Sequence, residues 1–186
     1  MHDQDTRAQL IQLLKDRSYE RKKVILKSGR ESDFYVDGRQ TTLNAEGAVM
    51  IGRLIHERLL REDEPIVGVG GMTLGADPIA TAVSVISALD GDPIHAFLVR
   101  KEKKGHGMGR QVEGMANLAE GARVCVVEDT STTGGSVLAA IKAAEEVGLE
   151  VAVVITIVDR CEGAEQNLAK EGYRLEALVT REELEG

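Results

Sequence analysis

Residues 124–137, VCVVEDTSTTGGSV, contain the pattern that decides the fold class. An apolar run from Val124 to Val127 precedes two acids, Glu128 and Asp129, and a turn rich in hydroxyl groups and glycine. A short apolar run is typical of a parallel strand that is covered on both faces. Glycine lets backbone N–H groups approach an anion closely, and the start of a helix adds unpaired donors. The stretch therefore predicts a buried strand, a phosphate-binding loop and a helix.

The two adjacent acids distinguish this loop from an ordinary phosphate-binding loop. Carboxylates repel phosphate, so we expect Glu128 and Asp129 to face hydroxyl groups or a bound divalent cation. A ribose 5-phosphate group offers both partners, because it carries a phosphate and a neighbouring cis-diol. The simpler alternative is that Asp129 only caps the following helix, a role that needs one acid or hydroxyl.

Apolar periodicity along the rest of the chain predicts alternating strands and helices. Such alternation favours an α/β fold with a doubly wound, mostly parallel sheet flanked by helices. Ligands of these sheets bind beyond the carboxyl ends of the strands, where the polar segments of this chain fall. Besides two short strands within 23–37, we expect strands at 66–69, 95–100, 124–128, 151–158 and 174–179, and helices at 5–16, 44–60, 76–88, 137–147 and 163–171.

Composition and charge limit the class of protein. A length of 186 residues, 42% of them hydrophobic, fits a single domain over residues 1–186. The net charge of −8 argues against general binding to nucleic acid or to an anionic membrane. No secretory signal is visible, and Cys125 and Cys161 suit neither a disulfide framework nor a metal cluster. We expect a cytoplasmic protein in which Cys125 packs inside its strand.

Residues 100–110, RKEKKGHGMGR, form a positive island in this acidic chain, with five Lys or Arg against one acid. Three glycines make a stable helix or strand here improbable, so we predict a mobile loop. A cationic loop beside a phosphate site could close over an anionic ligand and then release it. The alternative is a solvated surface loop.

Five segments in sequence order support a narrower interpretation: KSGRESDFYVD, GGMTLGADPIA, RKEKKGHGMGRQVEG, CVVEDTSTTGGS and VDRCEGA. Together they resemble the orotate phosphoribosyltransferases, a type I phosphoribosyltransferase family, over about residues 18–179. The resemblance implies transfer of the phosphoribosyl group of phosphoribosyl pyrophosphate (PRPP) to orotate in pyrimidine (UMP) biosynthesis, giving orotidine 5′-monophosphate and pyrophosphate. It also implies the type I fold, with a small N-terminal hood formed mainly by residues 1–40 and the C-terminal segment.

The same resemblance implies roles for individual residues. Catalytic roles fall on Lys104, His106 and Asp129, and orotate contacts on Lys27, Tyr35, Thr132 and Arg160. The residues implied to bind PRPP or pyrophosphate are Arg100, Lys101, Lys104, His106, Glu128, Asp129, Thr130, Ser131, Thr132, Thr133, Gly134, Gly135 and Ser136. Mg²⁺ would bind mainly through the substrate, and a homodimer would share the basic loop 101–113 between subunits.

Two departures from the family pattern concern substrate contacts. Leu74 stands where some members have a lysine that contacts PRPP, and Val36 replaces a residue that is often aromatic. Two other functions stay open: a phosphoribosyltransferase for a purine or uracil, and a non-catalytic regulator that senses PRPP. An anionic base such as orotate requires cations, which Arg160 and Lys27 would supply, although Arg160 could instead only pair with Asp159. His56 is expected on the protein surface.

Overall fold

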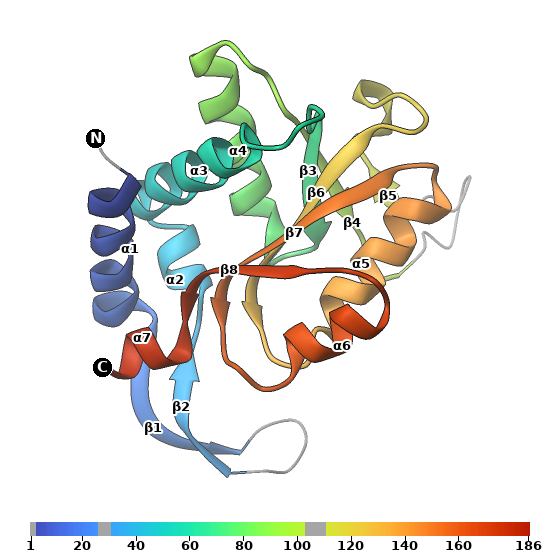
Figure 1. The fold of residues 1–186 in the computed structure, drawn as a ribbon. Helices are drawn as coiled ribbons and strands as arrows, with labels where there is room; N and C mark the ends of the chain where they lie inside the picture. Colours follow the sequence, from blue (N-terminus) through green and yellow to red (C-terminus); the bar gives the residue numbers. More distant parts are fainter. Residues whose placement is uncertain (1–2, 26–30, 103–110) are drawn as a thin grey trace.

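The computed structural model describes residues 3–25, 31–102 and 111–186 (Figure 1). The strands of its main sheet are β3 (Gly68–Met72), β4 (His95–Val99), β5 (Val112–Glu113), β6 (Arg123–Ser131), β7 (Glu150–Asp159) and β8 (Leu175–Thr180). They lie in the order β5-β4-β3-β6-β7-β8. All neighbouring pairs are parallel except the edge pair of β4 and β5. The predicted mostly parallel, doubly wound sheet is confirmed.

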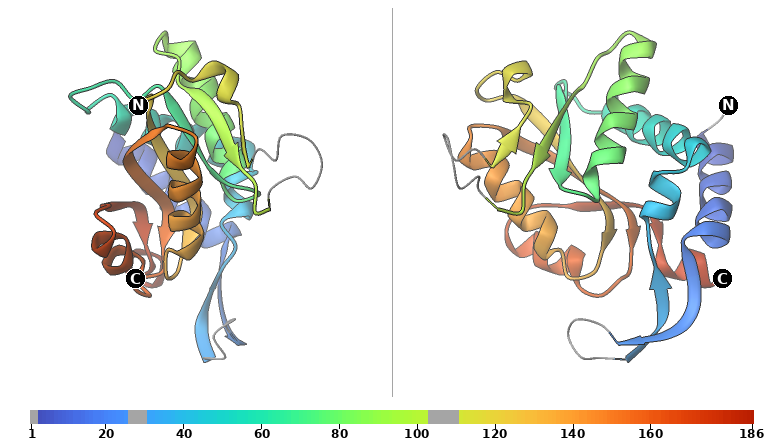
Figure 2. Two further views of the ribbon diagram at one scale, coloured as in Figure 1. Left: turned by 90° about the vertical axis from the view of Figure 1, so that its right-hand side faces the viewer. Right: turned by 180° about the vertical axis from the view of Figure 1, so that it is seen from behind.

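Helices cover both faces of this sheet (Figures 1 and 2). They are α1 (Asp3–Arg17), α2 (Arg39–Thr42), α3 (Ala45–Leu59), α4 (Ala76–Asp90), α5 (Gly135–Glu146), α6 (Ala164–Lys170) and α7 (Arg181–Glu185). A 3-10 turn spans Met115–Asn117. Among the described residues, no helix is both long and apolar enough to cross a membrane.

Strand β6 shows why the sheet needs a layer of helices on each side. Its side chains alternate between the two faces, as they do in any strand. Cys125 and Val127 belong to the buried cluster that includes residues of α1, α3 and α4, whereas Val124 and Val126 belong to the cluster that includes α5 and α6. All four side chains are almost fully buried, so the expected buried position of Cys125 is confirmed.

A two-stranded antiparallel hairpin, β1 (Tyr19–Ile25) and β2 (Glu31–Val36), projects from the body of the molecule (Figure 2). Its base lies beside α1 and α7, the two ends of the chain (Figure 1). Arg7 of α1 pairs with Glu183 of α7 at 2.7 Å and donates to the carbonyl of Leu178 in β8. The rings of Tyr19 and Phe34 stack with centroids 5.1 Å apart. The N-terminal and C-terminal segments therefore meet at the carboxyl side of the sheet.

Strand β1 starts at Tyr19, before the predicted range 23–37, and two strands of the main sheet differ from their predicted bounds by more than one residue. The strand expected at 66–69 is found at Gly68–Met72, because its glycines allow close contact with neighbouring strands. A Cβ on Gly70 would lie 2.1 Å from the carbonyl oxygen of Phe97. The strand expected to end at Glu128 continues to Ser131, because its backbone stays paired with β7 through Asp159. Apolar periodicity could show neither feature.

The expected surface position of His56 is wrong. Its side chain is buried between α3 and α4, with 1% of the residue exposed. Nδ1 lies 3.3 Å from Oδ2 of Asp90, at the end of α4. The apolar face of α3 is therefore wider than the sequence pattern suggested, because α4 covers this position as well.

Candidate active site

The acid pair lies at the carboxyl end of β6, in the middle of the sheet. Glu128 pairs in register with Thr156 of β7, and Thr130 pairs with Val158. Asp129 accepts a hydrogen bond from the backbone N–H of Thr130 at 2.9 Å. The alternative in which Asp129 caps the next helix is not observed, because the residue that precedes α5 is Gly134.

The start of α5 is shaped by glycine. Gly134 has a φ of +80°, a left-handed conformation that favours glycine. A Cβ at this position would also lie 2.5 Å from Cδ1 of Leu168. No side chain of the described residues caps α5 at this end. Its first backbone N–H groups are therefore available to an anion, and the helix dipole favours negative charge there.

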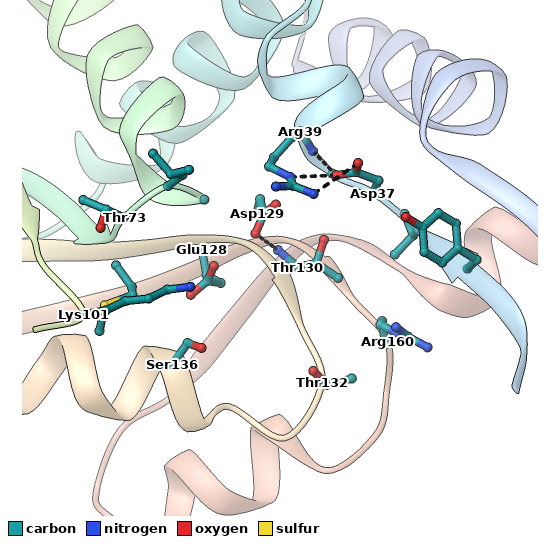
Figure 3. Close-up of a pocket in the computed structure, with 16 residues that line it drawn as sticks. Asp37, Arg39, Thr73, Lys101, Glu128, Asp129, Thr130, Thr132, Ser136 and Arg160 are labelled. Carbon is teal, nitrogen blue, oxygen red and sulfur yellow. Dashed lines mark hydrogen bonds and ion pairs between the residues drawn. The ribbon is translucent and has the colours of Figure 1, made fainter. Parts of the chain in front are cut away.

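These two elements border one cavity of about 340 Å³ (Figure 3). It is open to solvent and lined mainly by polar groups from β2, β3, β6 and the segments that follow these strands, together with one residue each from the segments after β4 and β7. The residues around it are Tyr35, Val36, Asp37, Gly38, Arg39, Met72, Thr73, Leu74, Gly75, Lys101, Glu128, Asp129, Thr130, Thr132, Ser136 and Arg160.

Two glycines let neighbouring segments approach the acid pair. A Cβ on Gly75 would lie 2.7 Å from Oδ1 of Asp129 and 2.7 Å from Oε1 of Glu128. A Cβ on Gly38 would lie 2.9 Å from Oγ1 of Thr130 and 3.1 Å from Cβ of Asp129. Side chains at either position would displace the carboxylates, so the geometry of the acid pair depends on both glycines.

Glu128 is the least solvated acid of the cavity. Only 8% of the residue is exposed, and its buried Oε2 has no hydrogen-bond partner among the described residues. Burial raises the pKa of Glu128 to about 8, and the neighbouring Asp129 carboxyl contributes in the same direction. An unpartnered buried carboxyl oxygen is costly, so the site favours a ligand that brings a hydroxyl donor or a cation.

Arg160 and Tyr35 reach the cavity from other elements than the acid pair. Arg160 directly follows β7 and donates through Nη2 to the carbonyl of Phe34 at 3.2 Å. The same nitrogen lies 3.0 Å from Glu162, so the suggested ion pair with Asp159 is replaced by one with Glu162. Nε of Arg160 is buried without a partner in the described part of the chain. A ligand acceptor could use this donor.

Several residues of the cavity were not predicted from the sequence. Asp37, in the turn after β2, and Arg39, the first residue of α2, form an ion pair at 2.9 Å (Figure 3). Partial burial alone would raise the pKa of Asp37, but hydrogen bonds from Arg39 and Gln40 outweigh it and lower that pKa. The available signal was the segment YVDGR, in which charged residues directly follow a strand.

The predicted site residues divide into three groups. Those brought to the cavity are Tyr35, Lys101, Glu128, Asp129, Thr130, Thr132, Ser136 and Arg160. Those that do not line it are Arg100, which pairs with Glu113, Ser131, which is buried, and Thr133, Gly134 and Gly135 around the start of α5. Lys27, Lys104 and His106 lie outside the described residues.

No group of three or more acidic, histidine or cysteine side chains that could hold a metal occurs within 3–25, 31–102 and 111–186. Glu128 and Asp129 nevertheless supply the oxygen atoms that Mg²⁺ prefers. Two acids alone suit a metal that takes most of its ligands from a substrate and from water.

The sheet, the acid pair and the open helix start together define a phosphoribosyltransferase: the family model for the phosphoribosyl transferase domain matches residues 45–176. Within this class, the chain belongs to the orotate phosphoribosyltransferase family. It is 50% identical to the orotate phosphoribosyltransferase of Aquifex aeolicus over 159 residues, which are 86% of this chain and 85% of the relative. It is 47% identical to that of Mycobacterium tuberculosis over 173 residues, 93% of each chain.

Solved structures agree with this assignment. The orotate phosphoribosyltransferase of M. tuberculosis in complex with Fe(III) dicitrate superposes with a TM-score of 0.82 at 46% identity, covering 96% of this chain and 98% of that one. The same M. tuberculosis protein in complex with PRPP gives a TM-score of 0.79 at 43% identity, covering 97% and 99%.

Proposed function

We propose that this protein transfers the 5-phosphoribosyl group of PRPP to orotate, giving orotidine 5′-monophosphate and pyrophosphate. This reaction is a step of pyrimidine biosynthesis. The observation that carries the proposal is one cavity lined both by the acid pair at the end of β6 and by Ser136 in the first turn of α5, a turn that no side chain of the described residues caps. The carboxylates suit the hydroxyl groups of a ribose 5-phosphate, and the backbone N–H groups beside them suit its phosphate.

The roles of the acids and of α5 follow from this match. Glu128 and Asp129 accept hydrogen bonds from the ribose hydroxyls and so fix the sugar. The backbone N–H groups at the start of α5, together with the hydroxyls of Thr132 and Ser136, bind the 5-phosphate. Fixing the donor sugar at both ends orients its anomeric carbon toward the base, which lowers the entropic cost of the reaction.

The reaction breaks the bond between ribose C1 and the diphosphate oxygen, and the electron pair leaves with pyrophosphate. N1 of orotate then bonds to C1 and gives up its proton, which passes to the departing pyrophosphate or to water. Lys101 lines the cavity and stabilises the departing anion, and Lys104 and His106 are proposed to act with it. Asp129 stabilises the positive charge that develops on the sugar.

We propose Mg²⁺ as the metal of this reaction. The unpartnered Oε2 of Glu128 and the carboxylate of Asp129 fit a cation that is bound chiefly through the ribose and diphosphate oxygens. When bound, Mg²⁺ neutralises charge on the diphosphate. Glu128 and Asp129 would help to hold the ion together with the substrate.

We propose that the base binds on the side of the cavity opposite Lys101, where Arg160 lies (Figure 3). Arg160 has a buried Nε without a described partner, and Lys27 is proposed to join it near the orotate ring. Tyr35 and Thr132 would complete this part of the site. A cationic base site favours orotate, an anion, over uracil or a purine.

A homodimer is the assembly that we propose. An apolar groove of about 390 Å³ runs between α3 and α4 and is lined by Leu43, Val49, Pro78 and Val85, among others. Leu43 and Val85 are 72% and 53% exposed, which is unusual for large apolar side chains that lie together. The first turn of α4 borders this groove, and Gly75 just before α4 lines the cavity. A second copy bound here would lie next to the active site, where it could supply loop 101–113.

The proposed hood is the hairpin β1–β2 with α1 and α7, which would cover the substrates. The cytoplasmic location expected from the sequence stays a prediction.

The proposed activity is tested by mixing the purified protein with PRPP, Mg²⁺ and single bases. We expect loss of the orotate absorbance and formation of pyrophosphate with orotate, and much slower reaction with uracil, adenine, guanine and hypoxanthine. Faster reaction with one of the other bases would support the alternative phosphoribosyltransferase. Binding of PRPP without turnover of any base would support the regulator.

A further inference from the structure

Three cations belong to the described lining of the cavity, and one of them has no role so far. Lys101 lies on the side of Thr73, and Arg160 lies on the opposite side, tied to Glu162 (Figure 3). Arg39 lies at the top of the cavity, above Asp129, in the same view. Its charge therefore faces the same cavity as the acid pair.

The guanidinium of Arg39 is held in place by one carboxylate. Nε donates to Oδ1 of Asp37 at 2.9 Å, and Nη2 reaches Oδ2 at 3.3 Å. The backbone N–H of Arg39 also donates to Asp37, and Gln40 donates to the same carboxylate. A guanidinium carries five N–H donors in a planar fork, so several remain for a ligand. About half of the Arg39 side chain is exposed to the cavity and solvent.

The backbone also fixes Arg39 relative to the acid pair. Gly38, directly before it, packs so closely on Thr130 and Asp129 that a Cβ would lie 2.9 Å from Thr130 Oγ1. Arg39 is close enough to Asp129 for the two charges to interact, as Asp129 contributes to the raised pKa of the guanidinium after the larger effect of Asp37. The guanidinium of Arg39 is therefore held near the acid pair and does not move freely over the protein surface.

The segment opposite Arg39, residues 73–75 after β3, has no cation of its own. It reads Thr73, Leu74 and Gly75, and Leu74 is 71% exposed. Gly75 lies against both acids, so an anion placed on this loop would be next to two carboxylates. Such an anion needs positive charge from neighbouring segments. Lys101 supplies it from one side, and Arg39 faces the loop across the acid pair.

We propose that Arg39 binds the diphosphate group of PRPP and the pyrophosphate product. This proposal deepens the proposed function and rests on it. Asp37 is a positioning residue, because it acts by orienting the guanidinium. The fork of Arg39 matches the oxygens of a diphosphate, and it replaces the positive charge that residues 73–75 lack. Arg39 stays bound to the leaving group as the C1–O bond breaks, so it stabilises charge in the transition state.

The test compares three ligands by calorimetry in the presence of Mg²⁺: PRPP, inorganic pyrophosphate and ribose 5-phosphate. The variants are Arg39→Gln, the conservative Arg39→Lys, and Arg53→Gln as a control for an exposed arginine on α3. We expect Arg39→Gln to weaken the binding of PRPP and of pyrophosphate by about tenfold or more. The affinity for ribose 5-phosphate should change by less than about twofold. Arg39→Lys should recover part of the loss, and Arg53→Gln should resemble the wild type.

If Arg39→Gln weakened the binding of ribose 5-phosphate as much as that of PRPP, the proposal would be overturned. Arg39 would then act on the sugar or on the acid pair. An unchanged PRPP affinity combined with a raised KM for orotate would also overturn it and assign Arg39 to the base. Donor binding is measured without any base. A result that contradicts the proposed role of Arg39 can therefore be told apart from a result that contradicts the proposed orotate activity.

Discussion

At the scale of single residues, the site depends on a carboxyl group that the fold keeps away from water. Glu128 lies at the end of a central strand, between Asp129 and the segment that contains Gly75. Its pKa of about 8 means that it keeps a proton at neutral pH until a ligand arrives. Hydroxyl donors or Mg²⁺ would favour the ionised form, so ligand binding and proton release are coupled at this residue.

The pH dependence of stability follows from this pKa. Between pH 4.5, the ordinary value, and about pH 8, Glu128 is protonated in the folded protein and ionised in the unfolded chain. The folded state then binds more protons, so the free energy of unfolding falls as pH rises through this window. We expect Glu128→Gln to remove this contribution. In urea unfolding without ligand, the variant should gain stability relative to the wild type between about pH 5 and about pH 8. If the free energy of unfolding changed with pH in the same way in the wild type and in Glu128→Gln, the raised pKa of Glu128 would be contradicted.

Gly75→Ala tests the close contact between the loop after β3 and the acids. The added Cβ would lie 2.7 Å from both carboxylates, so they must move. We expect kcat/KM for PRPP to fall by about tenfold or more, because small displacements of positioning groups are costly. The thermal midpoint should change by only a few degrees, since the loop is partly exposed. Unchanged kinetics would show that the acids need not hold this position.

At the scale of secondary-structure elements, helix α3 starts as the sequence predicts. The side chain of Asn44 accepts hydrogen bonds from the backbone N–H groups of Glu46 and Gly47, both at 3.0 Å. Asn44→Ala should lower the free energy of unfolding by about 1 kcal/mol. That corresponds to about 2–4 °C in thermal midpoint for a protein of this size. Asn44→Asp keeps an acceptor and should stay near the wild type, and an equal loss in both variants would refute the capping role.

Element types were predictable from apolar periodicity, but their ends were not. Pairing with β7 extends β6 through Asp129 to Ser131, although polar side chains made this stretch look like a loop. Glycine contacts shift β3, since Gly70 and Gly71 pack directly on neighbouring strands. Neither of these causes is local in sequence.

The site itself was predictable where its residues belong to one motif, at the end of β6 and the start of α5. The acid pair, Thr132 and Ser136 reach the cavity for that reason. Asp37 and Arg39 were missed because they come from the turn after the hairpin, which only the fold brings to β6. Ser131 was expected at the ligand, but strand alternation buries its side chain.

At the scale of the whole molecule, the apolar groove between α3 and α4 is the surface on which we propose that the dimer forms. Val85→Glu places a charge in this groove and should convert a dimer to monomers in sedimentation velocity at micromolar concentration. Val147→Glu, directly after the end of α5 and away from the groove, serves as the control and should stay dimeric. A wild-type monomer, or a dimer that tolerates Val85→Glu, would contradict the proposed interface.

The most direct measurement compares ribose 5-phosphate with 2-deoxyribose 5-phosphate by calorimetry, for the wild type and the double variant Glu128→Gln, Asp129→Asn. If the carboxylates bind the sugar hydroxyls and α5 binds the phosphate, the wild type should prefer the ribose compound by about tenfold. The double variant should still bind both compounds, with a preference reduced to about twofold or less. A preference that survives in the double variant would contradict this arrangement, because the hydroxyl would then be recognised elsewhere.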